Sequence, residues 1–109
     1  MPLKYNIIEV FTSEEEHWHK KPVWDSVVEY VNKSSIAARC LVIKGFSGSY
    51  ENAEIASNRI ETLSYNMPIK IEIILPAAEL GTILPGIEDM VSEGIVAVRD
   101  VMVGSHKTN

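Results

Sequence analysis

The strongest structural pattern in the chain is the stretch PIKIEIIL at residues 68–75. Isoleucines at positions 69, 71 and 73 alternate with Lys70 and Glu72, which predicts a β-strand with one buried face. Pro76 stops this strand, because proline cannot donate to a strand ladder, and it can begin a helix.

The segment after this strand predicts a helix and a further strand. The helix carries an apolar stripe at helical spacing: Leu80, Ile83, Leu84, Ile87 and Val91. Pro85 lies inside it and predicts a local kink, which Gly81 eases at the preceding turn. Gly94 is expected to cap its C-terminus. The last strand is expected over 95–103, followed by a polar tail.

The segment before residue 68 predicts the other half of the same arrangement. A strand is expected over 4–11, and a polar loop over 12–21. Pro22 suits the first turn of a helix, which ends over 32–35. Arg39 to Gly45 is rich in β-branched residues and predicts the second strand. The order βαββαβ predicts one domain, 1–109, with a ferredoxin-like α+β sandwich: an antiparallel four-stranded sheet with both helices on one face.

The composition and charge of the chain indicate which classes of protein are not expected. The chain has 109 residues, a formal net charge of −5 and one cysteine. Because its lysines and arginines are scattered, a nucleic-acid partner is not expected. No apolar run is long enough to span a membrane, and the N-terminus lacks a signal-peptide pattern. A lone cysteine fits a reducing compartment, so a cytoplasmic location is expected.

The strand patterns also predict self-association. In the first and last predicted strands, apolar residues such as Ile8, Val10 and Val98 alternate with residues that are also largely apolar. Both faces of the sheet then need a cover, and the two helices supply only one. We therefore expect a homo-oligomer.

The loop after the second strand is the main candidate for ligand binding. Glycines at positions 45 and 48 can expose backbone N–H groups to an anion, with Lys44 or Arg39 supplying charge. The predicted ligand set is Lys44, Gly45, Phe46, Ser47 and Gly48. The alternative is that two glycines simply turn the chain out of a strand.

The rest of this polar linker is a candidate surface for a partner protein. Ser49, Tyr50, Glu51 and Glu54 are expected to face solvent and to form it. A short helix competes with an open loop here, since four residues lie at near-helical spacing: Ala53, Ala56, Ile60 and Leu63.

Metal binding and catalysis have weaker support in the sequence than ligand binding at the glycine loop. His17 and His19 with Glu14 could hold a divalent metal, although a solvated loop anchored by Trp18 explains the same residues. Cys40 is expected to be a buried thiol. The chain has neither a Ser-His-Asp arrangement nor a nucleotide-binding fingerprint, so an enzyme is not expected.

The order of these segments resembles the PII signal-transduction proteins. KGFS at 44–47, followed by a linker and MPIKIEII at 67–74, is similar to the PII strand end, T-loop and following strand. Other motifs resemble an uncharacterised PII-like branch: TSE at 12–14, the Lys21-Pro22 helix entry with Val27, and EGIV at 93–96.

The resemblance implies a homotrimer without a resident cofactor. Small effectors, typically adenine nucleotides, would bind in clefts between subunits, and the 46–58 loop would regulate a partner such as a transporter or an enzyme. The glycine-rich phosphate loop that PII proteins carry after the second helix is reduced here to Ser92-Glu93-Gly94. The arginine pair that follows their last strand is absent. Two alternatives remain: a metal-responsive module that uses His17 and His19, and a trimeric adaptor without a ligand.

Overall fold

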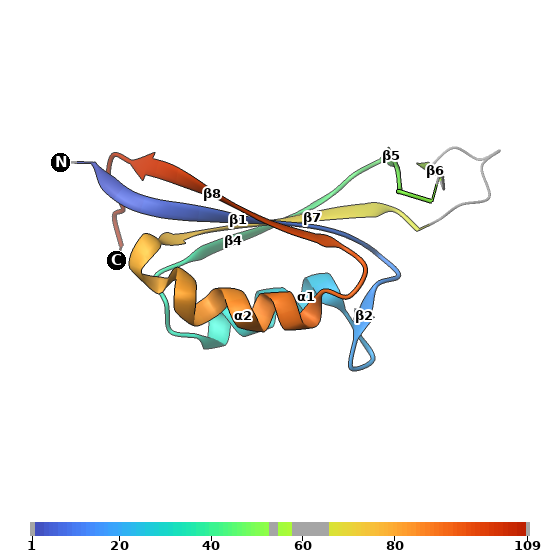
Figure 1. Ribbon diagram of the computed structural model, residues 1–109, viewed down its shortest axis with the longest axis horizontal. Helices are drawn as coiled ribbons and strands as arrows, with labels where there is room; N and C mark the ends of the chain where they lie inside the picture. The colour runs from blue at the N-terminus through green and yellow to red at the C-terminus, as the bar shows by residue number, and fades with distance from the viewer. Residues whose placement is uncertain (1, 53–54, 58–65, 109) are drawn as a thin grey trace.

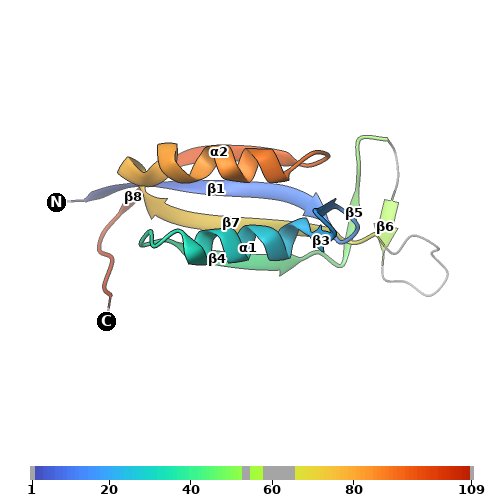
Figure 2. The same cartoon turned by 90° about the horizontal axis from the view of Figure 1, so that it is seen from below.

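The computed structural model describes residues 2–52, 55–57 and 66–108. Its main sheet has four antiparallel strands in the order β4-β7-β1-β8. Both helices pack on one face of this sheet, and the other face is open (Figures 1 and 2). The strands and helices are β1 (Leu3–Ser13), α1 (Val23–Lys33), β4 (Arg39–Lys44), β7 (Pro68–Pro76), η1 (Ala77–Glu79), α2 (Leu80–Met90) and β8 (Ile95–Val103). This arrangement confirms the predicted ferredoxin-like sandwich.

The core lies between the helices and one face of the sheet. In the central strand, Ile8 is opposite Ile73 of β7 and Val98 of β8. Because side chains alternate along a strand, the even positions of β1 face the helices there. The buried cluster joins these strands to both helices: Ile8, Val10, Val23, Val27, Val31, Ile69, Ile71, Ile73, Leu75, Ile83, Ile87 and Met90.

Two helix boundaries differ from those expected. Pro22 is the N-cap residue of α1 and precedes its first turn. It belongs to the two-residue strand β3 (Lys21–Pro22), which pairs with β2 (His17–Trp18). The α2 helix runs through Pro85 but ends at Met90, so the prediction that Gly94 caps it is wrong. Gly94 instead permits a close approach to β1, since a Cβ there would lie 2.3 Å from the carbonyl oxygen of Phe11.

The linker between β4 and β7 contains a second, small sheet. β5 (Ser47–Ser49) pairs with β6 (Ile55–Ser57), and we call the described residues of this part of the linker, 46–52 and 55–57, the arm. The arm extends beyond the end of the main sheet (Figure 2). The alternative of a short helix is wrong for residues 55–57, while Ala53, Glu54, Ile60 and Leu63 lie outside the described residues.

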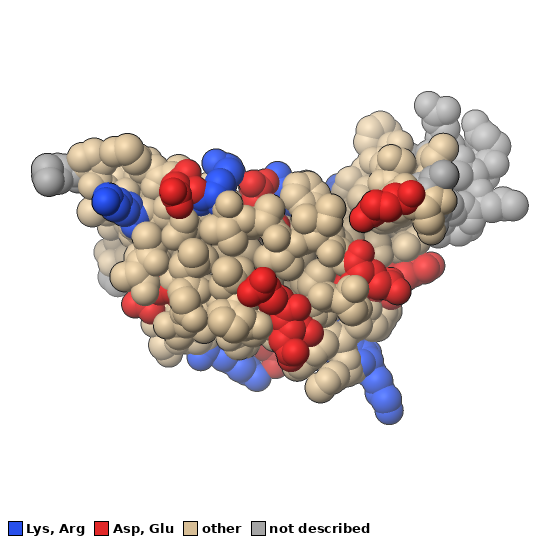
Figure 3. Space-filling view, viewed as in Figure 1, with Lys and Arg blue, Asp and Glu red and all other residues tan. Residues whose placement is uncertain are grey.

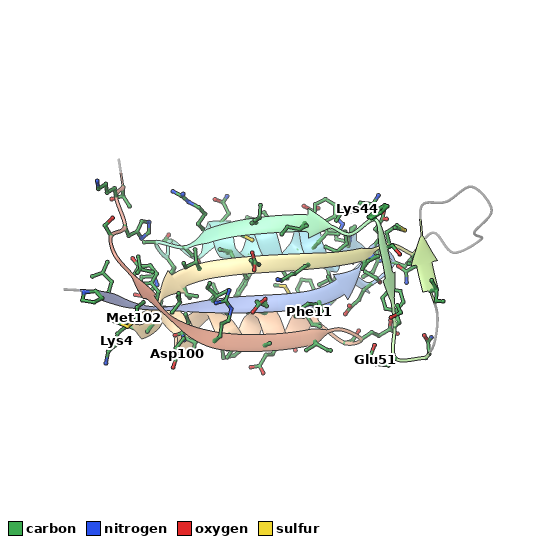
Figure 4. All side chains as sticks on the ribbon, turned by 90° about the horizontal axis from the view of Figure 1, so that it is seen from above. Lys4, Phe11, Lys44, Glu51, Asp100 and Met102 are labelled. Atoms are coloured by element: carbon green, nitrogen blue, oxygen red, sulfur yellow. The ribbon has the colours of Figure 1, made fainter. Side chains whose placement is uncertain are left out.

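The open face of the sheet combines a charged centre with an apolar surround. Glu9 pairs with Lys70 and with Arg99, each at 2.9 Å, and these ion pairs lie across three strands. Five large apolar side chains on this face are 41–53% exposed: Leu3, Phe11, Leu41, Ile43 and Ile95. Figure 4 views this face and labels Phe11 on it. Within the described ranges, no helix combines the length and apolar character needed to cross a membrane.

Candidate functional site

A cavity of about 700 Å³ lies where the arm meets the end of the main sheet. Antiparallel pairing brings the end of β1 beside the starts of β7 and β8, and the end of β4 leads into the arm. These segments supply the lining: Phe11, Thr12, Ser13, Glu16, Ile43, Gly45, Ser49, Tyr50, Glu51, Asn52, Asn66, Pro68, Ile69, Lys70, Glu93, Gly94 and Ile95.

The two glycines of the loop pack closely against Pro68. A Cβ at Gly45 would lie 2.9 Å from the Pro68 ring, and a Cβ at Gly48 would lie 3.0 Å from it. The Gly45 N–H donates to the Pro68 carbonyl at 2.8 Å. The prediction that Gly45 offers a bare N–H to an anion is therefore wrong, and close packing explains both glycines.

Part of the predicted ligand set lies away from the cavity. Gly45 lines it, whereas Lys44, Phe46, Ser47 and Gly48 do not. Lys44 pairs with Glu14 at 3.1 Å, and the Phe46 side chain is 73% exposed.

Arg39 cannot assist this loop, because it begins β4 at the end of the strand opposite Gly45. It lines a second cavity of about 370 Å³ with Tyr5, His106 and Lys107, where the Tyr5 hydroxyl lies 2.7 Å from His106 Nδ1.

The residues predicted to form a partner surface also differ in where the structure places them. Ser49, Tyr50 and Glu51 all line the cavity. Glu51 is exposed, and Figure 4 shows it on the arm. Tyr50 is half-buried, and its hydroxyl donates to the Asn66 carbonyl at 2.5 Å. The expectation that Tyr50 faces solvent is therefore wrong, while Glu54 lies outside the described residues.

Glu16 is a buried acidic residue of the cavity that the sequence did not single out. Glu16 is 5% exposed, and its carboxylate accepts hydrogen bonds from the Thr12 hydroxyl at 2.6 Å and from the backbone N–H groups of Ser92 and Glu93 at 2.9 and 3.1 Å. Three consecutive glutamates precede His17, and no sequence pattern distinguishes the buried one from its two neighbours.

Among the residues that the structure describes, the charged side chains lining the cavity are mainly acidic. Glu16, Glu51 and Glu93 line it, against Lys70. Lys70 pairs with Glu9 and with Glu72, and its hydrogen bond to Glu9 raises the pKa of the Lys70 amine. Figure 3 shows carboxylates near the base of the arm. An anionic ligand would therefore depend on backbone donors or on cations from another chain.

The remaining candidates do not form a reactive site in the described residues. His17 Nδ1 bonds to the Glu15 carbonyl at 2.6 Å, and His19 stacks on Trp18. No group of three His, Cys, Asp or Glu residues in the described ranges could hold a metal ion. Burial raises the pKa of the half-buried Cys40 thiol to about 11, as expected for an unreactive cysteine.

Comparison with known proteins supports the prediction that this chain is PII-like. A family model described as DUF190, "Uncharacterized ACR, COG1993", matches residues 5–103. A solved structure of CPII, a nitrogen regulatory PII-like protein from Thiomonas intermedia K12 bound to ADP, AMP and bicarbonate, is similar at 17% identity with a TM-score of 0.66. The match covers 96% of this chain and 92% of that one.

Two further structures of the same protein match similarly. CPII bound to ADP and bicarbonate is 16% identical with a TM-score of 0.68, covering 96% of this chain and 93% of that one. Its apo form is 16% identical with a TM-score of 0.62, covering 97% and 98% respectively. At these identities the similarity establishes the fold, and it confirms the PII-like architecture.

Proposed function

The chain belongs to the DUF190 family, and on that premise we propose that it is a PII-like regulatory protein. It binds a small anionic effector, an adenine nucleotide, in the cavity at the base of the arm. The 46–58 loop, whose described residues form the arm, passes the bound state to a partner such as a membrane transporter or an enzyme. The protein acts in the cytoplasm as a regulator and catalyses no reaction.

The observation that carries this proposal is the shared lining of the cavity. The sheet contributes residues such as Thr12 and Ile95, while the arm contributes Ser49 and Glu51. A ligand bound there contacts both parts at once, so its binding energy can favour one position of the arm. The volume of about 700 Å³ lies in the range of small-molecule sites. The CPII structures, with ADP, AMP and bicarbonate bound, support a nucleotide as the effector.

The cavity also lies at the edge of the proposed trimer interface. Phe11, Ile43 and Ile95 line the cavity and are also exposed on the open face of the sheet. If three copies cover their open faces together, each cavity becomes a cleft between subunits. A neighbouring subunit can then add positive charge to that of Lys70 in the mainly acidic lining.

The arm has the character of a docking surface. Phe46 and Ile55 are 73% and 63% exposed, and Glu51 lies between them in the sequence. Exposed apolar side chains near charged ones are typical of protein interaction sites.

Titration calorimetry with AMP, ADP, ATP and cyclic nucleotides tests the effector. Saturable binding is expected for at least one of them. Ser49→Trp fills the cavity from the arm and is expected to weaken binding. Ser105→Trp makes the same change at the second cavity and is the matched control. Absence of both heat and a melting shift with every nucleotide would contradict the nucleotide proposal. Loss of binding with Ser105→Trp alone would move the ligand to the second cavity.

A trimeric adaptor without a ligand remains the second candidate, and the acidic lining favours it. It predicts a trimer by light scattering together with a negative result for every nucleotide. The two measurements therefore separate the candidates.

A further inference from the structure

The turn that follows α2 contains two backbone donors that share one acceptor oxygen. The N–H groups of Ser92 and Glu93 both point to Oε2 of Glu16, at 2.9 and 3.1 Å. Consecutive backbone N–H groups aimed at one point form a concave site for an anion. In this chain the anion is a side-chain carboxylate from a residue 76 positions earlier than Ser92.

The charged and dipolar groups described beside this turn do not favour a carboxylate. The turn follows the C-terminal end of α2, where the helix dipole disfavours negative charge. Glu93 is itself acidic and lines the same cavity. The hydrogen bonds from the two N–H groups and from Thr12 are therefore what stabilise the Glu16 carboxylate there.

Glu16 is held in this position through its backbone as well. Its carbonyl accepts from the Val23 N–H at 2.9 Å, and its own N–H donates to the Ser13 carbonyl at 3.4 Å. Gly94 leaves room for the Glu16 carboxylate beside the turn, because a Cβ at position 94 would lie 3.2 Å from Glu16 Oε1. A carboxylate fixed in this way is present at the two donors at a high effective concentration.

We propose that Glu16 determines the ligand specificity of the cavity by occupying its anion-binding turn. This inference rests on the proposed function, in that the cavity binds an effector. A free phosphate, or a ligand whose phosphate must reach Ser92 and Glu93, competes with an internal carboxylate and is excluded. The cavity admits ligands whose anionic group lies away from residues 92–94.

The test titrates the full-length protein with inorganic phosphate and follows the amides of Ser92 and Glu93 by NMR. The wild-type protein is expected to show no saturable shift of these amides. Glu16→Ala removes the internal anion, so saturable shifts at both amides are expected, with phosphate affinity raised by about tenfold or more. Glu15→Ala removes an adjacent, exposed carboxylate and is expected to behave as the wild type.

A second variant keeps the shape of the side chain. Glu16→Gln removes the charge and replaces one of the two acceptor oxygens with an amide NH2 group, and it is compared with Glu15→Gln. A larger phosphate response in Glu16→Gln supports the proposal even if Glu16→Ala does not fold. Equal responses in these two variants, or a folded Glu16→Ala whose amides do not respond, would overturn it.

A parallel titration with AMP separates this inference from the proposed function. If AMP binds to the wild type and no Glu16 variant responds to phosphate, the proposed role of Glu16 in specificity is contradicted. The proposed effector site is then still supported. The opposite result, a phosphate response in the variants without any nucleotide binding, supports the occupied turn and contradicts the nucleotide effector.

Discussion

The carboxylate of Glu16 accepts a hydrogen bond from the backbone N–H of Ser92 at 2.9 Å, and it thereby joins the loop after β1 to the turn after α2. Glu16→Ala leaves this donor, the Glu93 N–H and the Thr12 hydroxyl without their acceptor. We expect the free energy of unfolding to fall by about 2 kcal/mol, the usual cost of losing hydrogen bonds to a buried charged group. Urea unfolding measures this loss.

Glu15→Ala is the matched control for that measurement. The Glu15 side chain is exposed, and its backbone N–H, which donates to Asn66 Oδ1, stays in place. A change within about 0.5 kcal/mol is expected, as for other surface substitutions. Equal losses for the two variants would show that the Glu16 contacts do not stabilise the fold.

The close contact between Gly45 and Pro68 predicts a coupled pair of substitutions. Gly45→Ala places a Cβ 2.9 Å from the Pro68 ring, and we expect a loss of about 1–2 kcal/mol from overpacking. In a Pro68→Ala background the ring is gone, so the same substitution should cost clearly less. A double-mutant cycle of urea unfolding free energies measures this coupling. Gly104→Ala is the control, since a Cβ there meets nothing within 4 Å. Additive effects would mean that the ring does not restrict position 45.

Burial of Cys40 predicts a thiol that reacts slowly in the folded protein. Cys40 is opposite Ile73 in β7, and burial raises its pKa from 9.0 to about 11. At pH 8 the thiolate is therefore scarce in the folded state, and Ellman's reagent should react slowly until urea is added. Fast labelling of the folded protein at pH 8 would contradict this.

The same pKa shift predicts a stability change at alkaline pH. A pKa that is raised in the folded state contributes stability that is fully present below the unfolded value near 9 and is lost as the pH rises toward 11. The wild type should therefore lose stability relative to Cys40→Ala between these pH values. Paired urea titrations at pH 8, 9, 10 and 11 follow the difference, which isolates the thiol from the other titrating groups.

The fold was predictable because its signals are local. The alternation in 68–75 and the apolar stripes of two helices each lie within one element, and their order restricts the topology to very few arrangements. The predicted helix cap at Gly94 failed because the packing of β8 against Phe11, rather than the helix end, requires glycine there.

The site was less predictable because its contacts join distant parts of the chain. Ser47 pairs with Ser57 across a linker that lacks an alternating pattern, and the Tyr50 hydroxyl bonds to a backbone carbonyl that any residue carries. The burial of Glu16 depends on the turn at residues 92–93, which no property of the Glu14–Glu16 run reveals. Cavity residues from the arm, such as Glu51, were predicted, but as a partner surface.

The exposed apolar side chains on the open face of the sheet predict that a charged substitution there changes the oligomeric state. Leu41 is 53% exposed on that face and lies opposite Glu72 in β7. In the proposed trimer, Leu41→Asp would bury an unpaired carboxylate beside Glu72, which costs several kcal/mol and should separate the subunits. Light scattering coupled to size exclusion should give three times the 12.2 kDa chain mass for the wild type and a single chain mass for the variant.

Met102→Asp is the matched control for this change. Met102, labelled in Figure 4, is 71% exposed, and its pairing with Lys4 places it on the other face of the sheet from Leu41, whose register runs through Glu72 to Glu9. Its substitution should leave the mass unchanged, because the proposed interface does not include that face. Circular dichroism verifies that both variants are folded. A wild-type mass equal to one chain at micromolar concentration would remove the trimer, and with it the neighbouring subunit as a source of positive charge for the cavity.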